Sequence, residues 1–162
     1  MSQILNAGER APDFTLQVTP DQTISLEDYH GRNLIILFYP ADWSPVCGDE
    51  IAVFNELLPE FHKYDADVIG ISVDSSWCHN AYAKDQHIHF PLLADFEPKG
   101  EVAKKYGAFR TDVGNCERAL FLVDKEGVIA WSYLSPVGKN PGADGVLRAL
   151  ENLSVPSVNL NS

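Results

Sequence analysis

Cys47 is the residue in this sequence with the clearest capacity for chemistry. It lies in the segment Pro40-Ala41-Asp42-Trp43-Ser44-Pro45-Val46-Cys47, directly after the apolar run 33–39. That run is almost uninterrupted and rich in β-formers, so it predicts a strand buried on both faces of a sheet. Ser44 and Pro45 then predict a helix start, with Ser44 as the N-cap and Pro45 at the first helical position. The pattern therefore places a thiol in the first turn of a helix.

A thiol at this position is suited to nucleophilic chemistry. Unpaired backbone N–H groups and the positive end of the helix dipole stabilise an anion there, and the thiolate is the reactive form of cysteine. The carboxyl end of a central strand is also where open α/β sheets form their crevices. Asp49 and Glu50 oppose the thiolate because they add negative charge to the start of the same helix. A fixed cation is therefore needed nearby, and the local sequence does not supply it.

The spacing Pro40-x-x-x-Ser44-x-x-Cys47 resembles the peroxiredoxin signature P-x-x-x-T/S-x-x-C, with serine where threonine is usual. The resemblance covers nearly the whole chain, through segments 11–14, 71–75, 90–95 and Arg118 with the strand that follows it. It is strongest to the PrxQ or bacterioferritin-comigratory type and to the alkyl hydroperoxide reductase E type. It implies a thioredoxin-like fold and a thiol-dependent peroxidase that reduces hydrogen peroxide and organic hydroperoxides without a cofactor.

The resemblance also implies a set of catalytic residues, namely Cys47, Ser44, Pro40 and Arg118. Cys47 attacks the peroxide and becomes a sulfenic acid. Arg118 and the backbone N–H of Cys47 are expected to stabilise charge on the leaving oxygen, and the Ser44 hydroxyl to accept from and donate to the peroxide. Pro40 is expected to pack over the thiol and exclude water. Without the resemblance, the sequence would predict that Arg118 is a surface residue at the end of a strand.

The sulfenic acid needs a second thiol, and three sources stay open. Cys78 is expected in the first turn of the helix after strand 67–74, so parallel strands would bring it to the same sheet edge as Cys47. A disulfide requires Cα atoms about 4.4–6.8 Å apart, so the helix ends would have to unwind first. Cys116, expected near the pocket rim or a subunit contact, is the second candidate. An external thiol is the third, as in enzymes resembling alkyl hydroperoxide reductase E.

The rest of the pattern predicts an α/β fold. Strand 33–39, the helix from Pro45 toward Phe61 and strand 67–74 form a βαβ unit, segments 118–124 and 128–133 form an antiparallel hairpin, and a helix around 146–153 follows. We therefore expect a mixed central sheet with helices on both faces and an N-terminal β-hairpin extension within 14–29. One domain over residues 1–155 and a tail over 156–162 are expected.

Composition excludes several classes of partner. The net charge of −11 repels nucleic acid and anionic membranes on average, and the chain has no apolar stretch near the ~18 residues of a membrane span. Three dispersed cysteines without C-x-x-C fit thiol chemistry in the cytoplasm and disfavour a thiol–disulfide exchanger. His87-x-His89 lacks a third ligand, so no metal site is expected. The resemblance favours thioredoxin or a similar thiol as reductant and a homodimer packed around the active-site loops.

Overall fold

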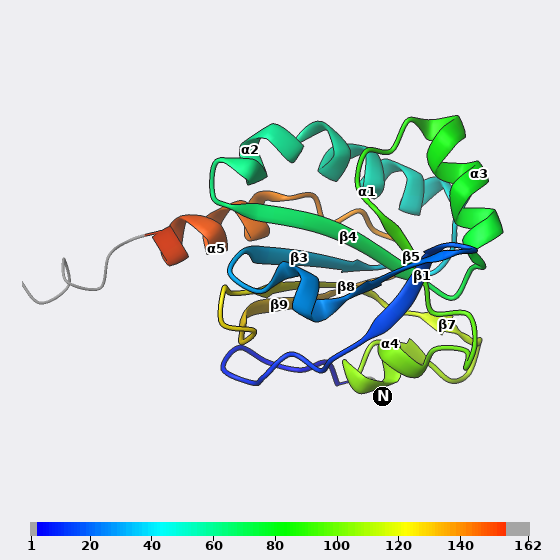
Figure 1. The fold of residues 1–162 in the computed structure, drawn as a ribbon, viewed down its shortest axis with the longest axis horizontal. Coiled ribbons are helices and arrows are strands. Elements are labelled where there is room, and N and C mark those ends of the chain that lie inside the picture. The colour runs from blue at the N-terminus through cyan, green and yellow to red at the C-terminus, as the bar shows by residue number, and fades with distance from the viewer. Residues whose placement is uncertain (1–2, 155–162) are drawn as a thin grey trace, which may run out of the picture.

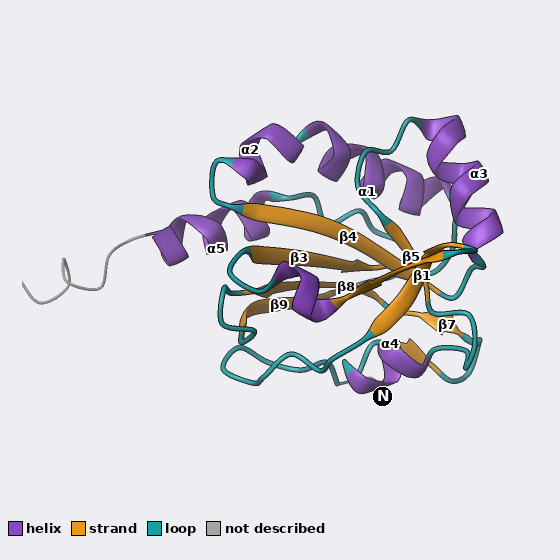
Figure 2. Cartoon of the chain, viewed as in Figure 1, coloured by secondary structure: helices purple, strands orange, loops and turns teal. Residues whose placement is uncertain are grey.

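The computed structural model describes residues 3–154, and its centre is a seven-stranded mixed sheet in the order β2-β1-β5-β4-β3-β8-β9 (Figures 1 and 2). The strands of this sheet are β1 (Thr15–Thr19), β2 (Gln22–Ser25), β3 (Asn33–Phe38), β4 (Ala66–Ser72), β5 (Leu92–Ala94), β8 (Arg118–Val123) and β9 (Ile129–Ser135). A separate two-stranded sheet pairs β6 (Phe109–Arg110) with β7 (Asn115–Cys116). The helices are η1 (Leu26–Tyr29), α1 (Pro45–Glu56), α2 (Leu58–His62), α3 (Ser76–Gln86), α4 (Glu101–Lys105) and α5 (Asp144–Ser154).

Strand β3 lies inside the sheet between β4 and β8, and each of its residues is buried. It pairs in parallel with β4 and antiparallel with β8. A strand covered on both faces needs apolar side chains at every position, which explains why its sequence shows no alternation. The predicted βαβ unit and the predicted hairpin of β8 and β9 are both confirmed.

Two apolar cores lie on the two faces of the sheet. Ile35 and Leu37 of β3 point into a core with α1, α2, α3 and α5, whereas Leu34, Ile36 and Phe38 point into a core with α4 and η1. This division follows from the two-residue period of a strand. Figure 1 shows α1, α2 and α3 above the sheet, α5 at its left and α4 below it. The expected mixed sheet with helices on both faces and an N-terminal hairpin is confirmed.

The helix predicted from Pro45 toward Phe61 is divided in two. α1 ends at Glu56, Leu57 separates the two helices, and α2 begins at Leu58. Pro59 explains the break, because proline lacks the N–H that would bond to the carbonyl four residues earlier and its ring clashes with that carbonyl. Cys47 therefore lies in the first and longer of the two helices, α1, which has 12 residues.

The described residues contain no helix long and apolar enough to cross a membrane. One domain over 1–155 remains a prediction, and the predicted tail over 156–162 lies outside the described residues.

Candidate active site

Cys47 lies in the first turn of α1, as predicted. Ser44 is the N-cap and Pro45 the first helical residue, and the first bond within the helix runs from Gly48 N–H to the Ser44 carbonyl over 2.8 Å. The backbone N–H of Cys47 comes before Gly48, the first donor of the helix, and is therefore available to an anion. The Ser44 side chain makes no capping hydrogen bond, so its hydroxyl is not consumed by the helix. The site thus has two donors beside a buried thiol.

Arg118 supplies the cation that the sequence required beside Cys47. Its Nη2 donates to Cys47 Sγ over 3.3 Å, and its Nε donates to the Val137 carbonyl over 2.9 Å. The antiparallel register pairs Phe38 with Ala119, so Arg118 lies where β3 ends and the loop to α1 begins. The side chain is only 1% exposed, which places the guanidinium charge in a site of low dielectric constant. Two predicted residues 71 positions apart are thereby brought into contact.

Glu50 belongs to the same cluster, which sequence reasoning missed. Its Oε1 accepts from Arg118 Nη1 over 2.8 Å, and its Oε2 has no hydrogen-bond partner among the described residues. Burial raises the pKa of Glu50 to about 7, although the hydrogen bond from Arg118 acts in the opposite direction. The spacing in the sequence could have indicated this contact, because a residue three positions after Cys47 in a helix lies on the same helix face. The carboxyl therefore shares the guanidinium with the thiol.

The loop before α1 is fastened to α3 by a buried polar network. Tyr39 Oη donates to Asp42 Oδ1 over 2.6 Å, and Asp42 Oδ2 lies 2.7 Å from Nδ1 of His79. The other ring nitrogen of His79 lies 3.0 Å from the Leu93 carbonyl oxygen. A carbonyl can only accept, so this nitrogen carries a proton, and a second proton lies between Nδ1 and the Asp42 carboxyl. The network fixes the loop that carries Pro40 and Ser44.

Pro40 lies two residues after the end of β3 and is partly exposed. Its fixed φ and missing N–H let the chain leave the sheet at this point without an unpaired donor. Trp43, further along the loop, has φ of 70°, an uncommon conformation for a bulky side chain. Its ring packs edge-on against Tyr82 with the centroids 5.0 Å apart. The short loop is therefore tightly turned and held against α3.

Cys78 lies in the first turn of α3, where Ser75 caps the helix by accepting from the Cys78 N–H over 3.2 Å. Its sulfur and one carboxylate oxygen each of Asp42 and Asp74 lie within 4.8 Å of one another. Burial and these two carboxylates raise the pKa of the Cys78 thiol to about 11. In this conformation the thiol is therefore protonated at neutral pH.

The same three residues have the donor types of a metal site, yet their carboxylates are already engaged. Asp74 Oδ2 accepts from the Asp42 backbone N–H over 2.8 Å and from the Ser72 hydroxyl over 2.5 Å. Asp42 is bonded to Tyr39 and His79. The geometry is that of a hydrogen-bonded network, which leaves few lone pairs directed at an ion.

Cys116 lies elsewhere than expected. It is fully buried in the core with α4, whereas Cys47 belongs to the core on the opposite face of the sheet. The prediction that Cys116 lies near the pocket rim or a subunit contact is therefore corrected. The pairing of β7 with β6 folds this segment inward. Burial, followed by the charge of Asp95, raises the pKa of this thiol well above its ordinary value.

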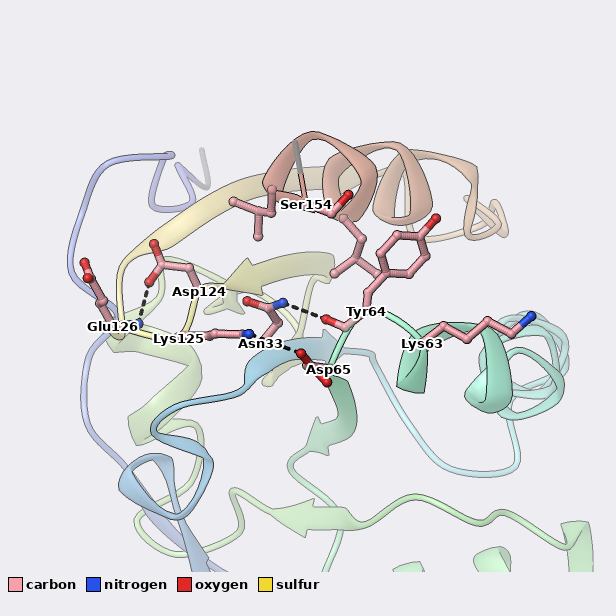
Figure 3. Close-up of a pocket in the computed structure, with 10 residues that line it drawn as sticks. Asn33, Lys63, Tyr64, Asp65, Asp124, Lys125, Glu126 and Ser154 are labelled. Carbon is pink, nitrogen blue, oxygen red and sulfur yellow. Dashed lines mark hydrogen bonds and ion pairs between the residues drawn. The ribbon is translucent and has the colours of Figure 1, made fainter. Parts of the chain in front are cut away.

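A surface pocket of about 360 Å³ lies at the other end of the sheet (Figure 3). Its lining includes Asn33 at the start of β3, Asp65 before β4 and Leu153 on α5. Lys125 at its edge is paired with Asp65 over 3.2 Å. The length of β3 separates the pocket from the Cys47 end by roughly 16 Å, at about 3.3 Å for each residue. It is therefore separate from the cysteine site.

A buried cysteine at a helix start, facing an arginine from the neighbouring strand of a thioredoxin-like sheet, defines a thiol-based peroxidase. The family model described as the AhpC/TSA family matches residues 7–132. The chain belongs to this family of peroxiredoxins, and it is a thiol-dependent peroxidase that reduces hydroperoxides through a cysteine.

Relatives and solved structures agree with this assignment. Alkyl hydroperoxide reductase E of Mycobacterium tuberculosis is 35% identical over 137 residues, which cover 84% of this chain and 90% of that protein. The structure of peroxidoxin BcpB from Mycobacterium tuberculosis has a TM-score of 0.85 at 26% identity and covers 93% of this chain and 99% of that one. AhpC of Enterococcus faecalis has a TM-score of 0.83 at 30% identity, with 93% of each chain covered.

Proposed function

We propose that Cys47 is the peroxidatic cysteine and that Arg118, Ser44 and Pro40 form its site. The Cys47 thiolate attacks the terminal oxygen of the hydroperoxide, an S–O bond forms, and the O–O bond breaks. The products are a sulfenic acid and an alkoxide or hydroxide, which takes up one proton to become an alcohol or water. The observation that carries the proposal is the 3.3 Å contact between Arg118 Nη2 and Cys47 Sγ inside a buried site.

Each neighbour has a defined part in this step. Arg118 and the backbone N–H of Cys47 stabilise the charge that grows on the leaving oxygen. The Ser44 hydroxyl, which the helix does not use, accepts a hydrogen bond from the peroxide O–H and donates one to the second oxygen. Pro40 shields the sulfur from water, so that the thiolate meets peroxide in a site of low dielectric constant.

Trapping with dimedone tests the assignment of Cys47. A variant with Cys78→Ser and Cys116→Ser receives one equivalent of hydrogen peroxide, and dimedone then labels sulfenic acid for peptide mass mapping. We expect one label, on Cys47. A variant with Cys47→Ser that keeps the other two cysteines serves as the matched control and should remain unlabelled. Labelling of Cys78 or Cys116 in that control, with none on Cys47 in the first variant, would overturn the assignment.

We propose further that Cys78 resolves the sulfenic acid. Its thiol attacks the Cys47 sulfur, a disulfide forms, and the sulfenic oxygen leaves as water. Both cysteines lie in the first turns of helices that follow the parallel neighbours β3 and β4. Local unwinding of these turns would separate Cys78 from Asp42 and Asp74, which lowers its pKa toward the ordinary value and permits attack.

Peptide mapping under non-reducing conditions tests this step. After one equivalent of peroxide we expect a Cys47–Cys78 disulfide in the unaltered protein and in Cys116→Ser. Asp74→Asn should accelerate its formation at neutral pH, because one negative charge facing the Cys78 thiol is removed. The remote substitution Asp112→Asn is the control and should leave the rate unchanged. Recovery of Cys47 only as sulfenic or sulfinic acid would instead assign resolution to an external thiol.

Thioredoxin or a similar dithiol is proposed as the reductant, and a homodimer as the assembly. The dimer is supported by three exposed aromatic side chains that follow the carboxyl ends of neighbouring strands, namely Trp43, Trp77 and Phe96, which are 53%, 73% and 54% exposed. Large apolar side chains gathered at one edge are typical of an interface. The cytoplasm is the proposed compartment, because reduced thiols persist there.

A further inference from the structure

The cluster around Cys47 contains two acids and one base. Arg118 donates one nitrogen to Cys47 Sγ over 3.3 Å and another to Glu50 Oε1 over 2.8 Å. Cys47 and Glu50 are 0% exposed, and Arg118 is 1% exposed. If both acids were ionised, the cluster would bury one uncompensated negative charge, which is costly in a site of low dielectric constant. The favoured state therefore holds one proton on the pair.

The geometry distinguishes between the two places for this proton. Cys47 lies in the first turn of α1, where backbone N–H groups and the helix dipole favour an anion, whereas Glu50 lies one turn later. Glu50 Oε2 has no donor within the described residues. An ionised carboxylate spreads its charge over both oxygens, so an unpartnered buried oxygen penalises ionisation of Glu50 more than that of Cys47.

The electrostatic surroundings of Glu50 agree with this distribution. Burial is the main influence on its carboxyl and raises its pKa to about 7, while the hydrogen bond and the charge of Arg118 from β8 act in the opposite direction. Cys47 shares this guanidinium, so a thiolate there competes with Glu50 for it. Cys47 and Asp49 of α1 both act on Tyr82 of α3, whereas neither Asp49 nor Tyr82 is among the influences on Glu50. At pH 6 a protonated Glu50 would therefore be the majority form.

We propose that Glu50 stores the proton that Cys47 gives up and returns it during peroxide reduction. The resting site consists of the Cys47 thiolate, the Arg118 guanidinium and protonated Glu50. Thiolate, hydroperoxide and the Glu50 carboxylic acid become sulfenic acid, alcohol or water, and the Glu50 carboxylate, so charge and protons balance. Once the sulfur is neutral, Arg118 pairs with ionised Glu50. The proposal rests on the proposed function, in which Cys47 is the reacting thiol.

Proton counting by stopped flow tests this proposal. The variant with Cys78→Ser and Cys116→Ser is mixed with one equivalent of hydrogen peroxide in weakly buffered solution containing a pH indicator. At pH 6 we expect no net proton uptake for each sulfenic acid formed, because Glu50 supplies the proton. Adding Glu50→Gln to this background should give an uptake of one proton, because Gln cannot release any. The matched control, Glu56→Gln on the exposed side of the same helix, should again give none.

The pH dependence and the carboxyl spectrum provide independent measurements. In the variant that retains Glu50, proton uptake should rise from none to one proton as the pH passes about 7. In the variant with Glu50→Gln added, it should stay at one proton. Infrared difference spectra at pH 6 should show loss of a protonated-carboxyl band on oxidation, and that loss should be absent in Glu50→Gln.

Two results would overturn the proposal that Glu50 stores the proton of Cys47. One is an uptake of one proton at pH 6 with Glu50 present, which would show that Glu50 was already ionised. The other is no uptake in either variant together with no thiolate absorbance before mixing, which would place the proton on Cys47. Absence of any Cys47 sulfenic acid would be a different failure, that of the proposed function itself, and dimedone labelling of the same samples identifies it.

Discussion

Nη2 of Arg118 lies 3.3 Å from Sγ of Cys47, although the two residues are 71 positions apart in the sequence. The contact exists because β8 pairs antiparallel with β3, so the first residue of β8 meets the strand end from which the chain enters the Cys47 helix. A fixed positive charge, an open helix N-terminus and exclusion of water thereby act on one sulfur atom. The arrangement gives that sulfur the surroundings of a nucleophile.

Removal of the guanidinium should slow the reaction without removing the thiol. Arg118→Met keeps the length and apolar part of the side chain but loses all three donor nitrogens of the guanidinium. We expect the rate constant for Cys47 oxidation by hydrogen peroxide to fall by about 10²-fold or more, as when a donor to a developing oxyanion is lost. Stopped-flow fluorescence at pH 7 measures it.

A double variant separates this catalytic loss from a loss of folding. Arg118→Met leaves the Glu50 carboxyl buried without its partner, so stability should also fall. Adding Glu50→Gln removes the unpaired buried carboxyl and should restore stability, measured by urea unfolding. The rate of Cys47 oxidation should stay low. Recovery of the rate together with stability would assign Arg118 a purely structural part.

Glu50 should make the protein less stable as the pH rises. Its pKa is about 7 in the folded protein, against an ordinary value of 4.5, so between these pH values the folded state binds more protons than the unfolded state. Its contribution to stability is therefore complete below pH 4.5 and is lost as the pH rises through 7. Relative to Glu50→Gln, the free energy of unfolding should fall by up to about 3 kcal/mol over this interval. Parallel urea titrations at pH 4.5 and 8 measure the difference, and equal changes in both proteins would contradict it.

His79 should be important for stability through Asp42. Both groups are almost fully buried, so His79→Leu leaves the Asp42 carboxyl without its ring partner. We expect a loss of about 3–5 kcal/mol in the free energy of unfolding. His62→Leu, at an exposed histidine, is the control and should change stability little. Adding Asp42→Asn to His79→Leu should recover part of the loss, whereas strictly additive losses would argue against a coupled pair.

The exposed tryptophan on α3 should report on assembly. If Trp77 lies in a dimer interface, Trp77→Glu would bury a charge there and favour the monomer. Sedimentation at micromolar concentration should show a dimer for the unaltered protein and a monomer for the variant. Val113→Glu, at another exposed apolar residue, is the control and should remain dimeric. Identical sedimentation of all three proteins would show that Trp77 does not lie in a dimer interface.

The local part of the site could be predicted because it depends on short-range rules. An apolar run followed by Ser44, Pro45 and Cys47 is sufficient to specify a buried strand, a cap and a thiol in a first helical turn. The meeting of Cys47 with Arg118 could be expected only through the family resemblance, since no local rule places a residue of β8 beside α1. The antiparallel register that produces it is a property of the whole sheet.

Other features escaped prediction because they depend on burial and direction in three dimensions. Glu50 reads locally as an acid that disfavours a thiolate, and its pairing with Arg118 is visible only when β8 is in place. The Asp42–His79 pair joins the loop before α1 to α3, and α1, α2 and β4 lie between them in the sequence. The sequence predicted Cys116 to be a loop residue near the site. The short β6–β7 pairing instead directs it into the core on the opposite face of the sheet.

The central claim is that the Arg118 guanidinium holds Cys47 as a reactive thiolate toward peroxide. It is tested most directly by the second-order rate constant of Cys47 with hydrogen peroxide, measured by stopped flow at pH 7 in the variant that retains only this cysteine. The account predicts a rate constant larger than that of free cysteine by about 10³-fold or more, with most of the increase lost in Arg118→Met. A rate constant equal to that of free cysteine, unchanged by the substitution, would contradict it.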